Sequence, residues 1–349
     1  MKQNLYNFDV SYDIQGIVSR VANDIEFFNG KSVLVTGATG FFGWWLLSVL
    51  QQLNRRPDCS IKLYAVSRNP NLFLKKHPEL QDNITFLKGD LRSFSLDGIL
   101  IDYCFHMATT NASETFNDED QINKIDLLYL GTKNLMSELV KAGTKKILFT
   151  SSGVIYGALP TQEDYRESSL MAPATTEPSS ALGEGKRLAE YVIAYYCKAN
   201  NIHYNIARCF SFVGPHLPLD LHYAIGNFIY DALNEDSISV KGTGLDVRSY
   251  LYIADAISWL LKMMVSPAMG EIYNVGSSRS VSIKDLAVLV RDHLAPEKQV
   301  IVHNKIKTSD NFERSIYVPN TEKIVRTLSV DEWSSLDESI LKTAAHAIG

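Results

Sequence analysis

SVLVTGATGFFGWWLL, at residues 32–47, places three glycines at three-residue spacing between a short β-branched run and a segment with apolar residues at helical spacing. This order predicts a strand, a tight turn and a helix. Gly37 permits the turn, Gly40 lets the backbone approach a phosphate, and Gly43 lets the helix pack closely on the strand. Because free N–H groups and the helix dipole favour an anion at a helix N-terminus, the segment predicts a dinucleotide-binding site.

The composition limits the classes of partner. The 349-residue chain has a net charge of -5 and no long Lys/Arg run, so nucleic acid and anionic membranes are not expected partners. Its four cysteines lie far apart, without C-x-x-C or clustered histidines, which predicts neither a disulfide framework nor a metal site. No apolar stretch reaches the roughly 18 residues that cross a bilayer, and the N-terminus is polar. We therefore expect a cytoplasmic protein.

Strand-like and helix-like segments alternate after the glycine-rich turn, with a strand expected at 61–66 and a helix at 126–142. Such βαβ units require right-handed crossovers and a mostly parallel sheet. The regular alternation ends near residue 210, and short helices are expected at 225–233 and 283–294. The predicted fold class is α/β, with a Rossmann-type doubly wound parallel sheet and a smaller mixed α/β lobe that binds substrate.

The predicted domains follow from this pattern. Residues 14–28 carry apolar side chains at helical spacing and predict an added helix lying on the sheet; contact with another subunit is the alternative. The domains are an N-terminal helical extension at 1–30, a dinucleotide-binding domain at 31–210 to which 245–262 returns, and a mainly substrate-binding lobe at 211–349.

The end of the second strand carries Ser67 and Arg68. This position lies beside the adenosine ribose of a bound dinucleotide, where an acidic residue would accept hydrogen bonds from the 2′-hydroxyl of NAD. A hydroxyl and a guanidinium suit a 2′-phosphate instead. The sequence therefore favours NADP, with NAD and a solvated surface arginine as the alternative.

Several separate motifs occur in one order along the chain. Together they resemble the extended short-chain dehydrogenases/reductases, specifically the nucleotide-sugar epimerases and dehydratases. The motifs are T-G-x-x-G-x-x-G at 36–43, G-D-L at 89–91, S-S-x-x-x-Y-G at 151–157, G-x-G-K-R-x-A-E at 183–190, F-V-G-P at 212–215, V-R-S-Y-L-Y-I-A-D at 247–255 and Y-N-V-G at 273–276.

The resemblance implies an NAD(P)-dependent enzyme with a nucleotide-diphosphate sugar as substrate. Such enzymes oxidise a sugar hydroxyl transiently, use the ketone, and return the hydride. It implies cofactor contacts at Gly37, Thr39, Gly40, Phe41, Phe42, Gly43, Ser67, Arg68, Asp90, Leu91, Met107, Ala108, Thr109 and Lys186. It also implies substrate contacts at Ser152, Asn227, Arg248 and Arg314, of which the last three are candidates for the diphosphate and have a solvated side chain as the alternative.

One position departs from the family pattern. The resemblance implies a catalytic Tyr one helical turn before Lys186, whose ammonium would lower the pKa of the phenol and hold the cofactor ribose. Leu182 occupies that position, and leucine can neither take nor give a proton. Ser152 matches the Ser/Thr that hydrogen-bonds the reacting hydroxyl, with a serine that caps the strand end as the alternative.

The two residues after Ser152 also differ from those of the nucleotide-sugar 4,6-dehydratases, a group within the family that the sequence resembles. Those enzymes carry Asp and Glu at the two positions. Gly153 and Val154 do not ionise, so dehydration by that pair is unsupported and C4 epimerisation is favoured. Three alternatives stay open: a dehydratase-like enzyme or ketoreductase with a non-standard base, a nucleotide-sugar binding protein without catalysis, and an introduced substitution at Leu182. The resemblance implies a homodimer through helices at 126–142 and 185–198. His106 and Tyr156 are interpreted as structural.

Overall fold

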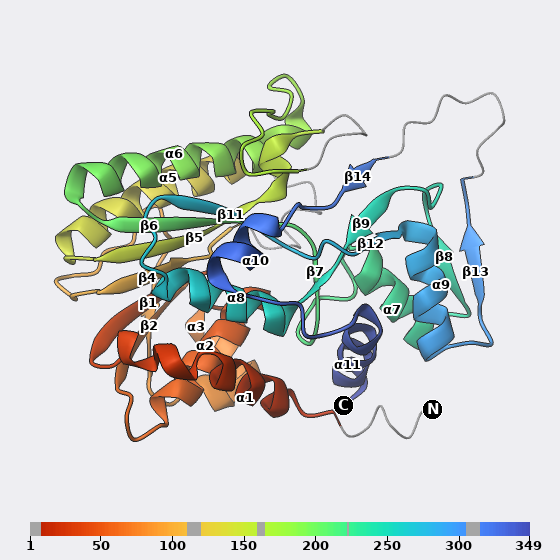
Figure 1. Ribbon diagram of the computed structural model, residues 1–349, viewed down its shortest axis with the longest axis horizontal. Coiled ribbons are helices and arrows are strands. Elements are labelled where there is room, and N and C mark those ends of the chain that lie inside the picture. The colour runs from red at the N-terminus through yellow and green to blue at the C-terminus, as the bar shows by residue number, and fades with distance from the viewer. Residues whose placement is uncertain (1–7, 110–119, 159–164, 222, 305–314) are drawn as a thin grey trace.

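The computed structural model describes residues 8–109, 120–158, 165–221, 223–304 and 315–349. Its central feature is a seven-stranded sheet in the order β3-β2-β1-β4-β5-β6-β11, with all neighbours parallel (Figure 1). The order reverses between β1 and β4, where open α/β sheets bind ligands outside the carboxyl ends of the strands. The predicted Rossmann-type α/β fold is confirmed. The strands are β1 Lys31–Thr36, β2 Ile61–Ser67, β3 Ile84–Lys88, β4 Tyr103–His106, β5 Lys146–Ser152, β6 His203–Cys209 and β11 Glu271–Val275.

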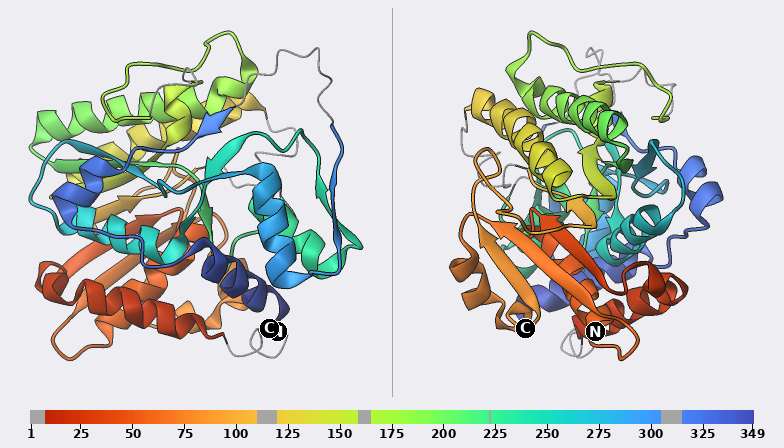
Figure 2. Two further views of the ribbon diagram at one scale, coloured as in Figure 1. Left: turned by 45° about the vertical axis from the view of Figure 1, so that its right-hand side comes forward. Right: turned by 90° about the vertical axis from the view of Figure 1, so that its left-hand side faces the viewer.

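Helices cover both faces of this sheet (Figures 1 and 2). On one face α5 Gln121–Lys141 packs against α6 Ala181–Asn200. On the other, α2 Phe41–Asn54 packs against α8 Ile253–Val265. The short helix α3 Pro70–Lys76 precedes β3. No helix in the described ranges is long and apolar enough to cross a membrane.

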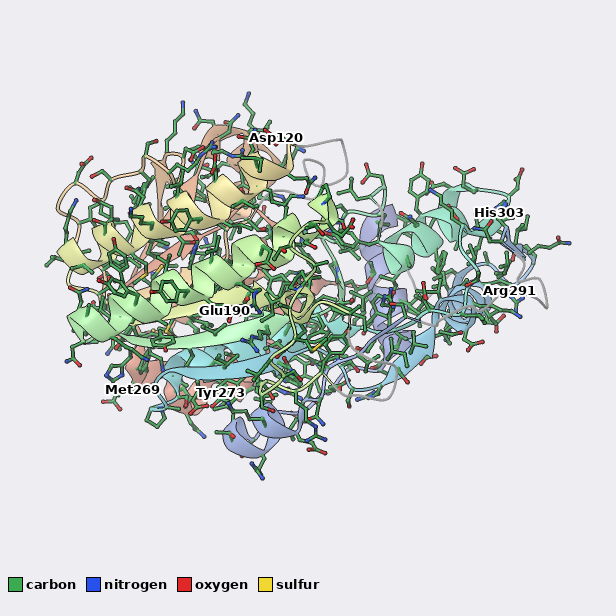
Figure 3. The ribbon with its side chains drawn as sticks, turned by 90° about the horizontal axis from the view of Figure 1, so that it is seen from above. Asp120, Glu190, Met269, Tyr273, Arg291 and His303 are labelled. Carbon is green, nitrogen blue, oxygen red and sulfur yellow. The ribbon has the colours of Figure 1, made fainter. Side chains whose placement is uncertain are left out.

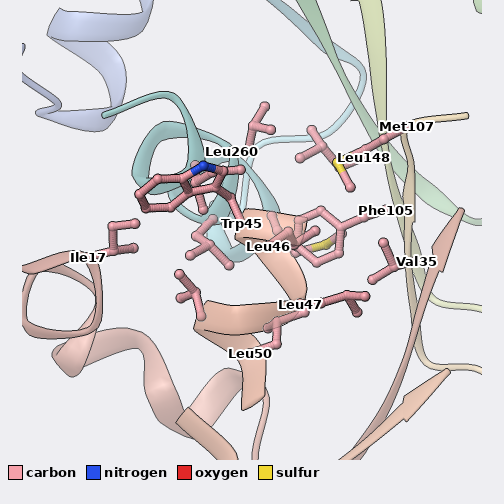
Figure 4. Packing of buried hydrophobic residues seen from close by; sticks show 14 of the residues in the cluster. Ile17, Val35, Trp45, Leu46, Leu47, Leu50, Phe105, Met107, Leu148 and Leu260 are labelled. Atoms are coloured by element: carbon pink, nitrogen blue, oxygen red, sulfur yellow. The ribbon is translucent and has the colours of Figure 1, made fainter. Parts of the chain in front are cut away.

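The N-terminal segment forms two pieces rather than the single helix expected over 14–28. Helix α1 Val10–Arg20 is followed by a 3₁₀ helix, Ala22–Phe27. Helix α1 packs on α2 and α8, so it lies outside the helices that cover the sheet rather than on the sheet itself. Ile17 and Phe28, on either side of the break, are both buried in the hydrophobic core that contains Trp45. Figure 4 shows Ile17 near Trp45 in this core. The apolar spacing thus identified the buried face, but not the change of helix type.

The smaller lobe follows β6 and contains several short sheets. Its helices are α7 Ala224–Asn234, α9 Ile283–Leu294 and α11 Leu336–Ile348. Its strand groups are β8 Ser237–Val240 with β13 Gln299–Val302, β7 Phe212–Val213 with β10 Leu251–Tyr252, and β9 Val247–Ser249 between β12 Ser280–Ser282 and β14 Ile316–Tyr317. Figure 3 shows this lobe extending to Arg291 and His303. Strand β11, α8 and α10 Glu322–Leu328, although late in the chain, lie with the large sheet. The predicted domain boundaries stay a prediction.

Asp255, in the first turn of α8, is a buried carboxyl whose titration should affect stability. Its side chain accepts a hydrogen bond from the Ser334 N–H at 3.3 Å, while Oδ1 has no partner among the described residues. Burial raises its pKa to about 8 from 3.8. Since the unfolded chain loses this proton first, the free energy of unfolding should fall as the pH rises from about 4 to 8, by at most about 1.4 kcal/mol per pH unit.

The substitution Asp255→Asn is therefore expected to flatten this decline and to stabilise the protein at pH 8 relative to the parent chain. Urea unfolding at a series of pH values measures both effects. Asp292→Asn, at an exposed carboxylate on α9, serves as the control. Parallel pH profiles for the Asp255 variant and the parent chain would contradict the prediction.

Candidate active site

A cleft of about 1580 Å³ opens at the carboxyl ends of β1, β2 and β4 and extends to the smaller lobe. Its wall brings together most of the residues predicted to contact the cofactor: Gly37, Thr39, Gly40, Phe41, Phe42, Ser67, Arg68, Asp90, Leu91, Met107, Ala108 and Thr109. Asn227 and Arg248 line the same cleft from the smaller lobe. Gly43, Ser152, Leu182 and Lys186 do not line it, and Arg314 lies outside the described residues.

The glycine turn leaves no room for a side chain at Gly37 or Gly43. Gly37 has a φ of +69°, and a Cβ there would lie 2.6 Å from the Met107 carbonyl. A Cβ at Gly43 would collide with the Gly37 carbonyl oxygen. Gly40 is the N-cap of α2 and makes no side-chain capping bond, so no side chain of its own occupies the N–H groups of the first turn. The geometry fits a dinucleotide pyrophosphate at this helix N-terminus.

The predicted adenosine end of the cleft carries an ordered charge cluster. Asp90, after β3, accepts hydrogen bonds from the Arg92 Nε at 2.9 Å and Nη2 at 2.8 Å. Arg92, with a smaller contribution from Arg68, lowers the Asp90 pKa to about 2. Ser67 accepts a hydrogen bond from the Asn69 N–H at 3.2 Å. This end of the cleft therefore carries the Arg68 guanidinium and the Asp90 carboxylate, and the carboxylate is paired with Arg92.

Ser152 and Lys186 lie at the carboxyl end of β5. The Lys186 side chain on α6 is buried; its Nζ donates to the Thr150 carbonyl at 2.7 Å and lies 4.8 Å from the Phe149 ring centroid. Burial lowers the pKa of this amine to about 8. Ser152 Oγ accepts a hydrogen bond from the Val154 N–H at 3.3 Å. Ser152 thus caps the 3₁₀ turn Gly153–Tyr156 that follows β5, and its predicted contact with the reacting hydroxyl stays a prediction.

The Ser152 turn lies next to the cleft wall. Phe210 lines the cleft, and its ring would come within 2.7 Å of a Cβ on Gly153. Arg248 in β9, which also lines the cleft, donates to the carbonyls of Val247 at 2.8 Å and Ser315 at 3.2 Å. These bonds hold the guanidinium at the edge of the cleft. The Asn227 amide faces carbonyl oxygens of its own lobe instead.

The comparisons with known proteins agree with this arrangement. A model of the NAD dependent epimerase/dehydratase family matches residues 33–276. The chain belongs to this family. Among curated relatives, UDP-glucuronic acid decarboxylase 6 of Arabidopsis thaliana is 27% identical over 285 residues, covering 81% of this chain and 80% of the relative. UDP-glucuronic acid decarboxylase 1 of Danio rerio is 24% identical over 316 residues, covering 90% of this chain and 72% of the relative.

Solved structures of the epimerase/dehydratase type share the fold. An epimerase from Methanothermobacter thermautotrophicus is 21% identical with a TM-score of 0.78, covering 95% of this chain and 96% of its own. UDP-glucuronic acid 4-epimerase from Bacillus cereus, solved with UDP-glucuronic acid and NAD, is 20% identical with a TM-score of 0.76 and coverage of 90% and 98%. At these identities the likeness shows the fold alone.

Within this epimerase/dehydratase fold, Tyr156 has a structural position. Its side chain is fully buried, and its hydroxyl donates to Asn274 Oδ1 at 2.8 Å and accepts from Arg208 Nη1 at 2.9 Å. Arg208 in turn forms a two-point ion pair with Glu190 of α6. Tyr156 therefore does not take the place of the missing phenol at Leu182.

His106 is also enclosed in the protein. Its Nδ1 lies 2.7 Å from the Thr36 hydroxyl and its Nε2 lies 3.0 Å from the Thr132 hydroxyl. Burial, with a smaller effect of Lys186, lowers its pKa to about 3, so the ring is neutral in the folded protein. Within the described ranges, no group of three or more His, Cys, Asp or Glu side chains is placed to hold a metal ion.

The sequence did not predict that Tyr317 lies beside the site. Tyr317 in β14 places its hydroxyl beside the Ser152 turn, where an ideal Cβ on Gly153 would lie 2.6 Å from it, and its ring centroid lies 4.6 Å from that of Phe210. The segment around Tyr317 was noted only for the neighbouring Arg314. No local pattern in the sequence indicates that the end of the chain returns to β5, so periodicity and spacing could not find this contact.

Proposed function

We propose that this epimerase/dehydratase family member is an NAD(P)-dependent enzyme that acts on a nucleotide-diphosphate sugar through a transient keto-sugar, with C4 epimerisation as its reaction. The observation that carries the proposal is the single cleft that joins the glycine turn to Arg248 of the smaller lobe. That cleft is large enough for a dinucleotide and a second nucleotide. Ser152 and Lys186 lie at the carboxyl end of β5 in the same sheet, outside the residues that line the cleft.

The bound dinucleotide supplies the hydride acceptor for oxidation of the sugar hydroxyl. In the proposed reaction, the Ser152 hydroxyl hydrogen-bonds the reacting oxygen, and the Lys186 amine accepts the proton that the missing tyrosine would have taken. A pKa of about 8 suits a general base near neutral pH. Gly153 and Val154 offer no acid or base for removal of water. Return of the hydride to the ketone therefore supports epimerisation better than elimination.

The names of the relatives suggest which substrates to test first. Several are UDP-glucuronic acid decarboxylases or 4-epimerases, so UDP-glucuronic acid leads the panel. A ketone at C4 of that sugar is β to the C6 carboxylate, which makes loss of CO2 accessible from the same intermediate. We propose that Arg248 and Arg314 bind the diphosphate; the Asn227 amide is left out of this proposal because its nitrogen donates to carbonyl oxygens of its own lobe.

The reaction can be tested by proton NMR in deuterium oxide. The purified protein is given NADP or NAD and a panel of UDP-, GDP-, CDP- and dTDP-sugars. Inversion at C4 without deuterium incorporation is the expected result. Deuterium at C3, C5 or C6 would show enolisation and overturn the C4 epimerase proposal. Saturable binding of a nucleotide sugar without any reaction would favour the binding protein that Leu182 suggests.

For the cofactor, we propose NADP, bound through Arg68. The substitution Arg68→Ala is expected to weaken NADP binding about 10- to 100-fold and to change NAD binding by less than about 2-fold. The reason is that only NADP carries a 2′-phosphate on the adenosine ribose for the guanidinium to bind. Calorimetric titration with each dinucleotide gives both dissociation constants. Arg56→Ala, outside the cleft, is the control. Equal losses for NADP and NAD would show that Arg68 does not bind the 2′-phosphate.

We also propose a homodimer through the outer faces of α5 and α6. These two helices expose large apolar side chains, namely Ile122, Leu130, Leu188, Tyr191 and Tyr195. Tyr191 is 69% exposed and Tyr195 is 62% exposed, and their rings stack at 6.4 Å along α6. Apolar surface gathered on one helix pair is typical of a protein interface. Sedimentation of the purified protein tests the assembly state.

A further inference from the structure

Three histidines from separate parts of the chain meet at the wall of the cleft. His77 caps the end of α3, His216 follows β7, and His346 lies in the last turn of α11. The ring centroids of His216 and His346 are 4.1 Å apart, and those of His77 and His216 are 5.4 Å apart. His77 and His216 line the cleft. The fold therefore brings three titratable rings together at one place on its wall.

His216 belongs to residues 214–219, which run between β7 and α7 and are called the wall segment below. The segment is held against α2, because the Trp45 Nε1–H donates to the Pro215 carbonyl at 2.9 Å and the Trp44 ring centroid lies 3.6 Å from that of His216. His216 has a φ of +69°, which is uncommon for a residue with a side chain. Such a backbone persists only where its surroundings fix it. The packing of the His216 ring thus determines the shape of this part of the wall.

Helix α11 reaches the wall segment with one face only. Ile340 and Ala344 lie in the core of the smaller lobe, and helical spacing places Lys342 and His346 on the opposite face. Lys342 Nζ donates to Asp13 Oδ1 of α1 at 2.7 Å. Figure 1 shows α11 between α1 and α9. His346 is one turn further along this face, where it packs on the wall segment.

The stacked arrangement requires neutral rings, because positive charges this close repel one another. Burial, and then His346 and His77, lower the pKa of His216 from 6.5 to about 3. Burial and His77 also lower the pKa of His346. The Glu79 carboxylate lies 3.3 Å from His77 Nδ1 and favours a proton on that ring, which would place a positive charge beside His216.

We propose that His77, His216 and His346 form a pH-sensitive latch, which holds the wall segment closed while the three rings are neutral and releases it when they take up protons. Histidine suits this role because it titrates just below neutral pH. Release changes the wall of the cleft on the side of Trp44 and the glycine turn. The latch goes beyond the proposed function, since it does not depend on which reaction the cleft performs.

The other contacts of α11 indicate which part of the structure moves. The ion pair between Lys342 and Asp13 involves no histidine, so it persists when the three rings become charged. On the opposite side, His293 Nε2 of α9 lies 2.5 Å from Asp337 Oδ1 of α11. Protonation of His293 strengthens this pair. Acid therefore leaves α11 attached to α1 and α9, and only its contact with the wall segment is lost.

Hydrogen exchange of the full-length chain, followed by mass spectrometry, measures the opening. An opened segment returns its histidines to their ordinary pKa of about 6.5, so the open state binds more protons than the closed state. After correction for the intrinsic exchange rate, the open fraction of residues 214–221 should rise below about pH 6.5, by up to about 10-fold per pH unit for each histidine that titrates. Peptides of α5 should show no such rise. An open fraction that stays constant, or an equal rise in α5, would overturn the latch.

His346→Phe tests the latch directly. Phenylalanine keeps a planar ring in the last turn of α11 but cannot take up a proton. The rise in the open fraction should become shallower by up to about 10-fold per pH unit, the contribution of one histidine. His203→Phe, at an exposed histidine in β6, is the matched control and should keep the parent pH dependence. A parent-like dependence in His346→Phe, or a weakened one in His203→Phe, would overturn the proposal.

The protonation of His216 itself gives a second readout, which does not require turnover. With [¹³Cε1]histidine in the protein, the His216 resonance is assigned by its disappearance in His216→Asn, since asparagine tolerates a positive φ. In the parent chain this resonance should titrate over the same pH range in which the wall segment opens. Titration of His216 at a pH where the segment stays protected from exchange would show that the ring accepts a proton in the closed state, and would overturn the latch.

Discussion

Leu182→Tyr is expected to raise the rate of cofactor reduction by a nucleotide sugar about 100-fold or more, the usual contribution of a positioned acid or base. The helix that carries this position is fixed in register. A Cβ on Gly183 would lie 2.7 Å from Pro173 Cγ, and one on Gly185 would lie 2.7 Å from Leu128 Cδ1. A phenol at 182 would stand one turn before the buried Lys186, on the same face of α6.

The pH dependence of the two proteins should also differ. In the parent chain the rate should rise with pH and level off above about 8, because Lys186 must lose its proton before it can act as a base. In Leu182→Tyr the phenol takes the proton, and the Lys186 ammonium lowers the phenol pKa. The rate should then level off at a lower pH than in the parent chain.

Stopped-flow absorbance of the reduced cofactor measures this rate at each pH. Leu188→Tyr adds a phenol to the exposed face of the same helix and is the control. An unchanged rate in Leu182→Tyr, with cofactor and nucleotide sugar still bound, would show that the site no longer supports the family chemistry. A rate that also rises in Leu188→Tyr would show that the position of the phenol is irrelevant.

The parts of this protein that were predictable from the sequence are those set by local rules. The glycine turn was predictable because Gly37 needs a positive φ and Gly43 needs a position without a side chain, and both requirements appear in the structure. Parallel strands follow from the alternation of strands and helices. Most residues predicted to bind the cofactor line one cleft because they follow strands that end at the same edge.

The position of Tyr317 beside the Ser152 turn was not predictable, because it depends on how the last part of the chain returns to the sheet. Strand β14 has only two residues and is placed by pairing with β9. Nothing in the spacing of neighbouring residues encodes that pairing. The split of the N-terminal segment at Val21 was missed for a related reason, since the apolar positions alone do not distinguish an α-helix from the 3₁₀ helix that follows it.

Arg208→Met is expected to lower the free energy of unfolding by about 3–5 kcal/mol, the cost of leaving a buried charge without its partner. Arg208 Nε donates to Glu190 Oε1 at 3.2 Å and Nη2 donates to Oε2 at 2.9 Å. Both side chains are 11% exposed. Figure 3 shows Glu190 on α6. In the sequence of this helix Glu190 follows Lys186 by one turn. The ion pair therefore joins the helix of the active site to β6.

A double variant without either charge separates two contributions to the free energy of unfolding. One is the penalty of burying an unpaired carboxylate, and the other is the contribution of the intact ion pair. Arg208→Met combined with Glu190→Leu should recover most of the lost stability, because replacing a buried ion pair with apolar residues is often neutral or stabilising. Arg56→Met, which breaks an exposed pair with Asp58, should leave the unfolding curve unchanged. Urea unfolding of all three variants provides the comparison.

The double variant also loses the hydrogen bond that Arg208 Nη1 donates to the Tyr156 hydroxyl at 2.9 Å. Tyr156 keeps its own bond to Asn274, which in turn donates to the Tyr165 carbonyl at 2.7 Å. If the double variant recovers the parent free energy of unfolding, the aromatic cluster around Tyr165 and Tyr317 is held by packing and by Asn274. The two charges then only neutralise each other and do not support the cluster. If it stays as unstable as Arg208→Met, the arginine supports this network directly, and the site depends on the ion pair for its shape as well as its stability.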